Sequence, residues 1–177
     1  MSSVARMRAH LFLALLVCAS QNAHACRRPP EEQLASPDQL LARVNDVSVA
    51  RVVSAVQLDA REVEYRFVVT RRIAGPAVET FSVFGSAALP GEVTRRGDEA
   101  DHAGPRFWVR GGGRTMNDSD CRIHPAFAVG ETYLVMLDQP WTWRSFEHIP
   151  GGVGGYNVND KWLRYVEFKL GARDTGG

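Results

Sequence analysis

The chain has 177 residues, of which 45% are hydrophobic, and its formal net charge at pH 7 is +1. This length and apolar content are enough for one domain with a hydrophobic core of its own. The near-balance of 21 basic and 20 acidic side chains excludes the strongly basic surface by which proteins bind nucleic acids.

Residues 1–25 are predicted to be a secretory signal peptide. Arg6 and Arg8 form its basic start, and residues 11–19 are an apolar core that is too short to span a bilayer. Ala23 and Ala25 are the small residues that a signal peptidase reads, so we expect cleavage before Cys26. Cleavage there would yield a secreted or periplasmic protein with no transmembrane segment. This mature chain would have 19 basic and 20 acidic side chains. The alternative is an uncleaved membrane anchor.

The cysteines support the same compartment. Cys18 leaves with the signal peptide, and Cys26 and Cys121 remain. An even number of cysteines in an oxidising compartment predicts one disulfide. A bridge closing so long a loop contributes on the order of 4 kcal/mol by restricting the unfolded chain. The alternative is a lipoprotein with an acylated Cys26, although Ala23 stands where the lipidation pattern prefers leucine.

The mature chain is predicted to begin extended and then to form a short helix. Prolines 29 and 30 keep residues 26–30 out of a helix. Ser36 is expected to be an N-cap, with Pro37 in the first helical position and Gln39 completing a capping box. This helix should end near residues 45–46.

Alternating and valine-rich segments then predict a mostly β domain. Strands are expected at residues 47–58, 62–73 and 78–84, joined by short turns as an antiparallel meander. A fourth strand is expected at residues 132–137 and a fifth at 141–149. The long, glycine-rich stretch between the third and fourth strands is typical of a functional or mobile loop.

The chain is predicted to finish with a helix. Asn159 or Asp160 is its expected N-cap, and Gly171 its expected end. Its buried face is predicted from spacing to hold Leu163, Val166 and Leu170. Residues 172–177 should form a flexible tail.

The segment from Cys121 through Phe127, Gly130 and Tyr133 to Val135 resembles a motif of the netrin-like domain. Residues 49–54 and 65–75 resemble the first two strands of that family, which includes the N-terminal domain of tissue inhibitors of metalloproteinases. The resemblance covers residues 26–171. It implies a five-stranded antiparallel OB-type Greek-key barrel with a short N-terminal helix and a C-terminal helix.

The resemblance also implies a bridge between Cys26 and Cys121. The family's second bridge is missing, because Arg28 stands at one of its positions and no cysteine follows Cys121. In the inhibitors, the amine and carbonyl of the terminal cysteine chelate the protease zinc, and the next side chain enters the specificity pocket. Here that side chain is Arg27, which suits a pocket for small or apolar groups poorly.

Other chemistry has weak signals. His102, His124 and His148 lack the close pairing of zinc ligands, so we expect loop or rim histidines and no metal site. Ser119 and Ser145 lack the glycine pattern of a nucleophile elbow. The glycine run at residues 111–113 lacks the Lys-Ser/Thr of a phosphate loop. We therefore expect no enzyme, no catalytic residue and no cofactor.

The sequence predicts an exported binding protein that engages a protein partner. The expected contact residues lie at the mature N-terminus and on an aromatic edge, for which capping of the barrel is the alternative role: Cys26, Arg27, Arg28, Pro29, Trp141 and Trp143. Two alternatives stay open. One is a metalloproteinase inhibitor that chelates zinc through the Cys26 amine, and the other is a lipid-anchored structural or assembly protein of the envelope.

Overall fold

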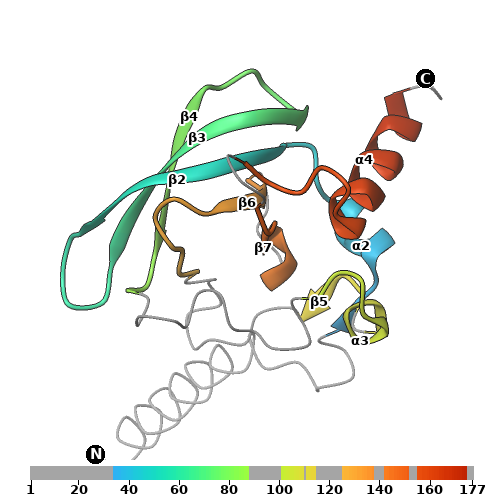
Figure 1. The fold of residues 1–177 in the computed structure, drawn as a ribbon, viewed down its shortest axis with the longest axis horizontal. Coiled ribbons are helices and arrows are strands. Elements are labelled where there is room, and N and C mark those ends of the chain that lie inside the picture. Colours follow the sequence, from blue (N-terminus) through green and yellow to red (C-terminus); the bar gives the residue numbers. More distant parts are fainter. Residues whose placement is uncertain are drawn as a thin grey trace, which may run out of the picture.

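A computed structural model describes residues 34–87, 101–109, 111–114, 125–137, 142–151 and 155–174. Strands dominate this part of the chain, with a few short helices (Figure 1). In chain order the elements are β1 (Leu34–Ala35), α2 (Pro37–Leu41), β2 (Val47–Gln57), β3 (Val63–Ala74), β4 (Thr80–Gly85), α3 (Pro105–Val109), β5 (Gly113–Arg114), β6 (Thr132–Met136), the 3-10 helix η4 (Trp143–Ser145), β7 (Phe146–His148) and α4 (Lys161–Asp174).

The main sheet has five strands in the order β4-β3-β2-β6-β7, and every neighbouring pair is antiparallel. The expected meander is confirmed, because β2, β3 and β4 pair consecutively. The fourth expected strand, β6, returns to lie beside β2, where Leu134 pairs with Val49. The sheet is open, since no pairing between β4 and β7 occurs among the described residues.

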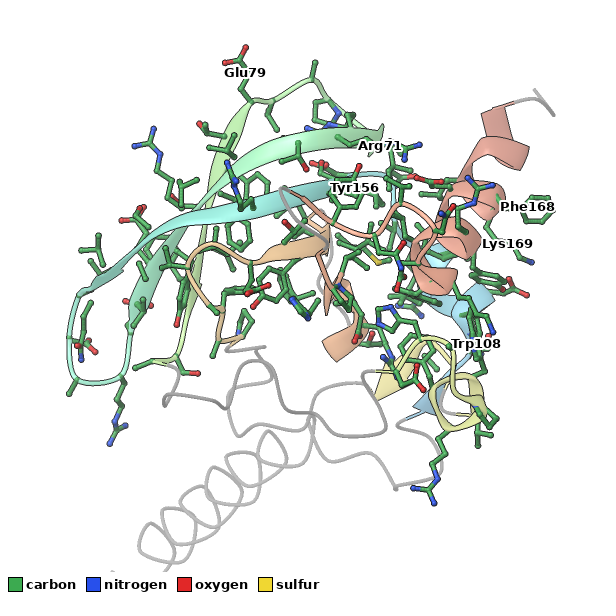
Figure 2. All side chains as sticks on the ribbon, in the orientation of Figure 1. Arg71, Glu79, Trp108, Tyr156, Phe168 and Lys169 are labelled. Atoms are coloured by element: carbon green, nitrogen blue, oxygen red, sulfur yellow. The ribbon has the colours of Figure 1, made fainter. Side chains whose placement is uncertain are left out.

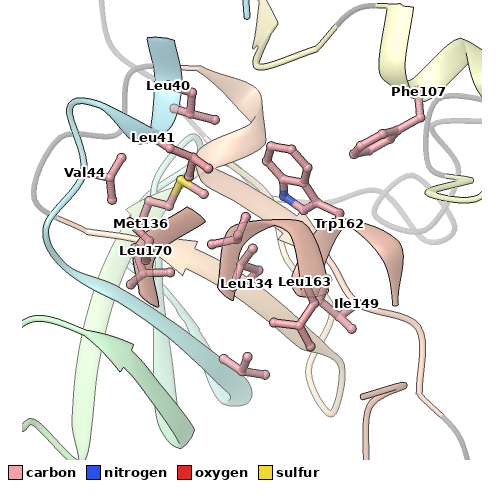
Figure 3. Packing of buried hydrophobic residues seen from close by; sticks show 13 residues of the cluster. Leu40, Leu41, Val44, Phe107, Leu134, Met136, Ile149, Trp162, Leu163 and Leu170 are labelled. Atoms are coloured by element: carbon pink, nitrogen blue, oxygen red, sulfur yellow. The ribbon is translucent and has the colours of Figure 1, made fainter. Parts of the chain in front are cut away.

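Both faces of the sheet carry a hydrophobic core, and the alternation of side chains along β2 divides them between the two. Val47 and Val49 face the helices, while Ala50 and Val52 lie on the other face. On the helical face, α2 and α4 cover the sheet (Figure 3). Its fully buried members include Leu40, Leu41, Val44, Leu134, Met136, Ile149, Trp162, Leu163 and Val166.

The other face holds an aromatic cluster. Phe127 lies at its centre, with ring centroids 5.1 Å from Tyr65, 5.0 Å from Phe67 and 5.0 Å from Tyr133. The Phe127 ring also contacts Phe146 of β7 at 5.5 Å. One side chain from the segment before β6 thus packs against β3, β6 and β7 together.

The predicted helix starts are confirmed. The Ser36 hydroxyl accepts from Gln39 N at 3.1 Å, and the Gln39 side chain accepts from Ser36 N at 2.8 Å, which completes the capping box. Asp160 caps α4, because its Oδ1 accepts from Leu163 N at 2.9 Å. Leu163, Val166 and Leu170 are buried as expected, and Trp162, which the spacing argument left out, is buried with them.

Other element boundaries differ from the prediction. Gly171 does not end α4, which continues to Asp174. α2 ends at Leu41, earlier than expected. The helix α3 lies in the stretch predicted as a loop, and Phe107 is its fully buried anchor.

The fifth strand is also shorter than predicted. The first half of the expected strand is η4, because the Thr142 hydroxyl accepts from Arg144 N at 3.2 Å and the Thr142 carbonyl accepts from Ser145 N at 2.9 Å. None of the helices in the described ranges is long and apolar enough to cross a membrane.

Candidate functional site

Three distant segments of the chain meet beside the main sheet, and we call their meeting point the N-terminal junction: β1, residues 111–114 with β5, and Thr142. Ala35 pairs with Gly113 and Leu34 with Arg114 in a two-stranded antiparallel sheet. Gly112 N donates to Ala35 O at 2.7 Å, and Thr142 Oγ1 donates to Gly112 O at 2.7 Å. The segment that contains β1 and the segment that leads into η4 are therefore both bonded to residues 111–114.

The glycine run of the junction is buried and closely packed. A Cβ atom on Gly112 would lie 2.2 Å from Ser36 O, and one on Gly113 would lie 2.5 Å from Arg144 Cγ. Gly113 also has φ +87°, a backbone conformation that favours glycine. Residues 111–113 of the stretch predicted as a long functional or mobile loop are therefore closely packed, because glycine permits the close approach of the backbone.

The direction of the two short strands bears on the cysteines. Because β1 and β5 are antiparallel, the chain enters β1 and leaves β5 at the same end of their sheet. Cys26 precedes Leu34 by eight residues, and Cys121 follows Arg114 by seven. A bridge between the two cysteines would therefore link the two stretches that continue from this end.

Most of the residues predicted to contact a partner lie outside the described residues. These are Cys26, Arg27, Arg28, Pro29 and Trp141, and the same holds for Cys121 and His124. Trp143 opens η4, one residue after Thr142, and its side chain is outside the description. The structure therefore describes the chain next to each part of the predicted surface. β1 follows the N-terminal segment, and Thr142 and η4 follow Trp141.

A buried group of charged side chains lies next to the junction, and we call it the His102 cluster: His102, Arg144, Glu147 and Asp160. His102 Nδ1 lies 2.6 Å from Asp160 Oδ2, and His102 Nε2 lies 3.4 Å from Glu147 Oε1. Arg144 Nη1 contacts Glu147 Oε2 at 2.8 Å. His102 is only 4% exposed, Arg144 6% and Asp160 7%.

Aromatic side chains surround this cluster. The Phe107 ring lies 4.5 Å from the His102 ring, and the Arg144 guanidinium lies 3.5 Å above Phe107. Trp108 Nε1 donates to His102 O at 3.1 Å, and its ring contacts Trp162 and Tyr165. Figure 2 shows Trp108 on α3, and its ring contacts place it next to α4. Trp108 thus packs against the core on the helical face of the sheet.

The charges of the His102 cluster balance when His102 is protonated. Burial lowers the pKa of His102, but its hydrogen bonds to Asp160 and Glu147 outweigh burial and raise the pKa from 6.5 to about 9. The imidazolium and the Arg144 guanidinium then face two carboxylates. A buried cluster without net charge avoids most of the cost of burying an unpaired ion.

The geometry of His102 does not suit a catalytic base. Both ring nitrogens face carboxylates, and almost none of the side chain is exposed, so neither nitrogen is presented to a substrate. His102 lies in a turn, as the prediction of a loop or rim histidine had it, but its side chain is buried. Its partners lie 58 and 45 residues away in the sequence, and no local spacing signal identifies them.

The remaining candidate histidine is less buried. His148 Nε2 lies 2.9 Å from Glu131 Oε2, and 21% of its side chain is exposed. Within the described ranges, no group of three or more His, Cys, Asp or Glu side chains is arranged to hold a metal ion. Comparison of the chain with protein-family models, with curated proteins and with solved structures finds no match.

Proposed function

We propose that this protein is an exported, non-enzymatic binding protein of the netrin-like type. Its partner is a protein, contacted through the mature N-terminal segment, Cys26 to Pro29, and the edge that carries Trp141 and Trp143. The observation that carries the proposal is the N-terminal junction, where β1 and the residue between those two tryptophans, Thr142, bind the same short stretch of chain.

An OB-type barrel is the fold that we propose for the domain, and the strand order supports it. Strands β2, β3 and β4 are consecutive, and β6 returns after a long connection to lie beside β2, which is the order of a Greek key. Contacts also connect opposite parts of the sheet. Ser86 N, just after β4, donates to Pro125 O at 3.0 Å, and Phe127 contacts β3 and β7.

The proposed binding surface gains from the fixed position of the junction. A terminal segment binds more tightly when its attachment is already ordered, because less conformational entropy is lost on binding. Here β1 is fixed to β5, β5 is packed against Arg144, and Arg144 is held by Glu147 and Phe107. A disulfide between Cys26 and Cys121 would extend this order to the terminus.

The proposal is tested by capturing partners from an envelope extract of the native host with the mature protein and two variants. Trp141→Ala/Trp143→Ala removes the aromatic edge. Arg66→Ala, at an exposed position of β3 that is not part of the junction, is the matched control. We expect one partner with the mature protein and with the control, and loss of that partner with the tryptophan variant. Equal capture by all three would overturn the proposed surface.

The mature protein can also be used to test the alternative that it is a metalloproteinase inhibitor. A version with one alanine added before Cys26 blocks the amine that zinc chelation would need, while the rest of the surface is unchanged. Loss of binding to a purified zinc protease on this addition alone would assign the partner as a metalloproteinase. Retained capture of the envelope partner by the extended version is the result that the general binding proposal predicts.

A further inference from the structure

The charge of His102 depends on pH, and His102 lies on a short segment that packs against the core. The segment comprises residues 101–109 and includes α3. Its polar contacts with the rest of the domain include His102 to Asp160 and Glu147, Lys161 Nζ to Ala103 O at 3.4 Å, and Gly111 N to Trp108 O at 3.0 Å. Phe107 and Trp108 supply the apolar contacts, both with Trp162.

We propose that His102 is a pH-dependent latch, meaning that its imidazolium holds the 101–109 segment against β7 and α4 and that loss of its proton releases the segment. The groups that face it are Asp160 of α4 and Glu147 of β7. Arg144 of η4 is paired with Glu147, Lys161 approaches the backbone of Ala103, and Asp101 accepts from Ala103 N within the segment itself.

Loss of the proton changes the balance of charge in a buried place. With His102 neutral, two carboxylates face one guanidinium, so the cluster carries a net negative charge that is shielded from water. A buried charge without a partner is strongly unfavourable, and opening the segment allows water to solvate Asp160 and Glu147. The raised pKa of His102, about 9, agrees with this direction.

Release of the segment also reaches the N-terminal junction. Phe107 of the segment lies under the Arg144 guanidinium, and Arg144 packs against Gly113 of β5. When α3 leaves, Arg144 loses this aromatic contact and β5 loses part of its support. The latch therefore regulates the order of the proposed binding surface; this last step rests on the proposed function, whereas the opening itself does not.

Hydrogen exchange of the oxidised mature protein, measured without any partner between pH 7 and 9.5 and corrected for intrinsic rates, tests the latch. We expect protection of residues 101–109 to fall about tenfold per pH unit from pH 7 and to level off near pH 9. The second half of α4, which opens only on more extensive unfolding, should stay better protected than the segment at every pH. Tyr133, whose pKa burial raises to about 12, does not ionise in this range. Wild-type protection that is independent of pH would overturn the proposal.

Two variants and one control assign the effect to His102. His102→Gln should show low protection of the segment at every pH. Asp160→Asn keeps an oxygen for the N-cap but removes the charge, so it should fold and lose most of the pH dependence. His148→Gln, which removes the more exposed histidine, should behave as wild type. A pH profile that survives in Asp160→Asn would contradict the assignment.

Where His102→Gln does not fold, the proton itself can be followed by NMR. The ring signals of His102 in the wild type should titrate with a midpoint near pH 9, and the indole signal of Trp108, which donates to His102 O, should shift with the same midpoint. A midpoint below pH 7 would overturn the latch. None of these measurements involves a partner, so a failed latch and a failed binding proposal remain distinguishable.

Discussion

At the scale of single residues, Phe127 has the widest packing role on the aromatic face of the sheet. Its ring contacts Tyr65, Phe67, Tyr133 and Phe146, and the residue is 3% exposed. Phe127→Ala should lower the free energy of unfolding by about 3–5 kcal/mol, because a ring is removed from a packed interior. Denaturant titration measures this loss.

Phe84→Ala is the matched control for that change. Phe84 is 53% exposed on β4, so its truncation should cost less than about 1 kcal/mol. Equal losses from the two variants would show that Phe127 does not occupy a packed interior.

Because the pKa of His102 is raised in the folded protein, the free energy of unfolding should depend on pH. The contribution of His102 is fully present below its unfolded pKa near 6.5 and is lost as pH rises through about 9. The difference amounts to on the order of 3 kcal/mol. The urea midpoint of the wild type should therefore fall between pH 6.5 and 9. A flat midpoint over this interval would contradict the ion pairs of His102 with Asp160 and Glu147.

At the scale of elements, the close packing of β1, α2 and β5 predicts that Gly112 accepts no side chain. A Cβ there would meet backbone atoms of Ser36, which cannot rotate away. Gly112→Ala should cost about 2 kcal/mol or more of stability and should expose the junction to proteolysis. Gly155→Ala is the control, since a Cβ at Gly155 has no neighbour within 4 Å, and its unfolding midpoint should match that of the wild type.

The end of α4 gives a second prediction at this scale. In the structure Gly171 is helical, and a Cβ at that position meets nothing within 4 Å. Gly171→Ala should therefore stabilise the protein by up to about 1 kcal/mol, because alanine is the better helix former. If Gly171 were instead a left-handed helix end, as the sequence suggested, the same substitution would be destabilising. Thermal unfolding distinguishes the two.

The elements that could be predicted from the sequence are those with local signals. The capping boxes and strand alternation are such signals, and Ser36, Asp160 and the strands β2 to β4 were predicted on that basis. α3 was missed because five residues carry too little periodicity to identify a helix. η4 was missed because its start depends on hydrogen bonds of Thr142, whereas the sequence there also alternates as a strand does.

At the scale of the whole molecule, the antiparallel sheet could be predicted and the His102 cluster could not. The cluster joins residues 102, 144, 147 and 160, which meet only after the sheet and α4 have formed. A histidine in a glycine-rich stretch looks like a surface residue until its partners are known. For the candidate site, the N-terminal segment and the tryptophans could be predicted from the sequence. The structure adds the N-terminal junction, where β1 and Thr142 are bonded to the same stretch of chain.

We propose that the mature chain begins at Cys26 and that a disulfide joins Cys26 to Cys121. The most direct test is the intact mass and the N-terminal peptide of the protein from its native host, measured without reduction. We predict that the chain starts at Cys26 and that a peptide containing Cys26 is linked by a disulfide to a peptide containing Cys121. An acylated Cys26, or Cys121 as a free thiol, would contradict it.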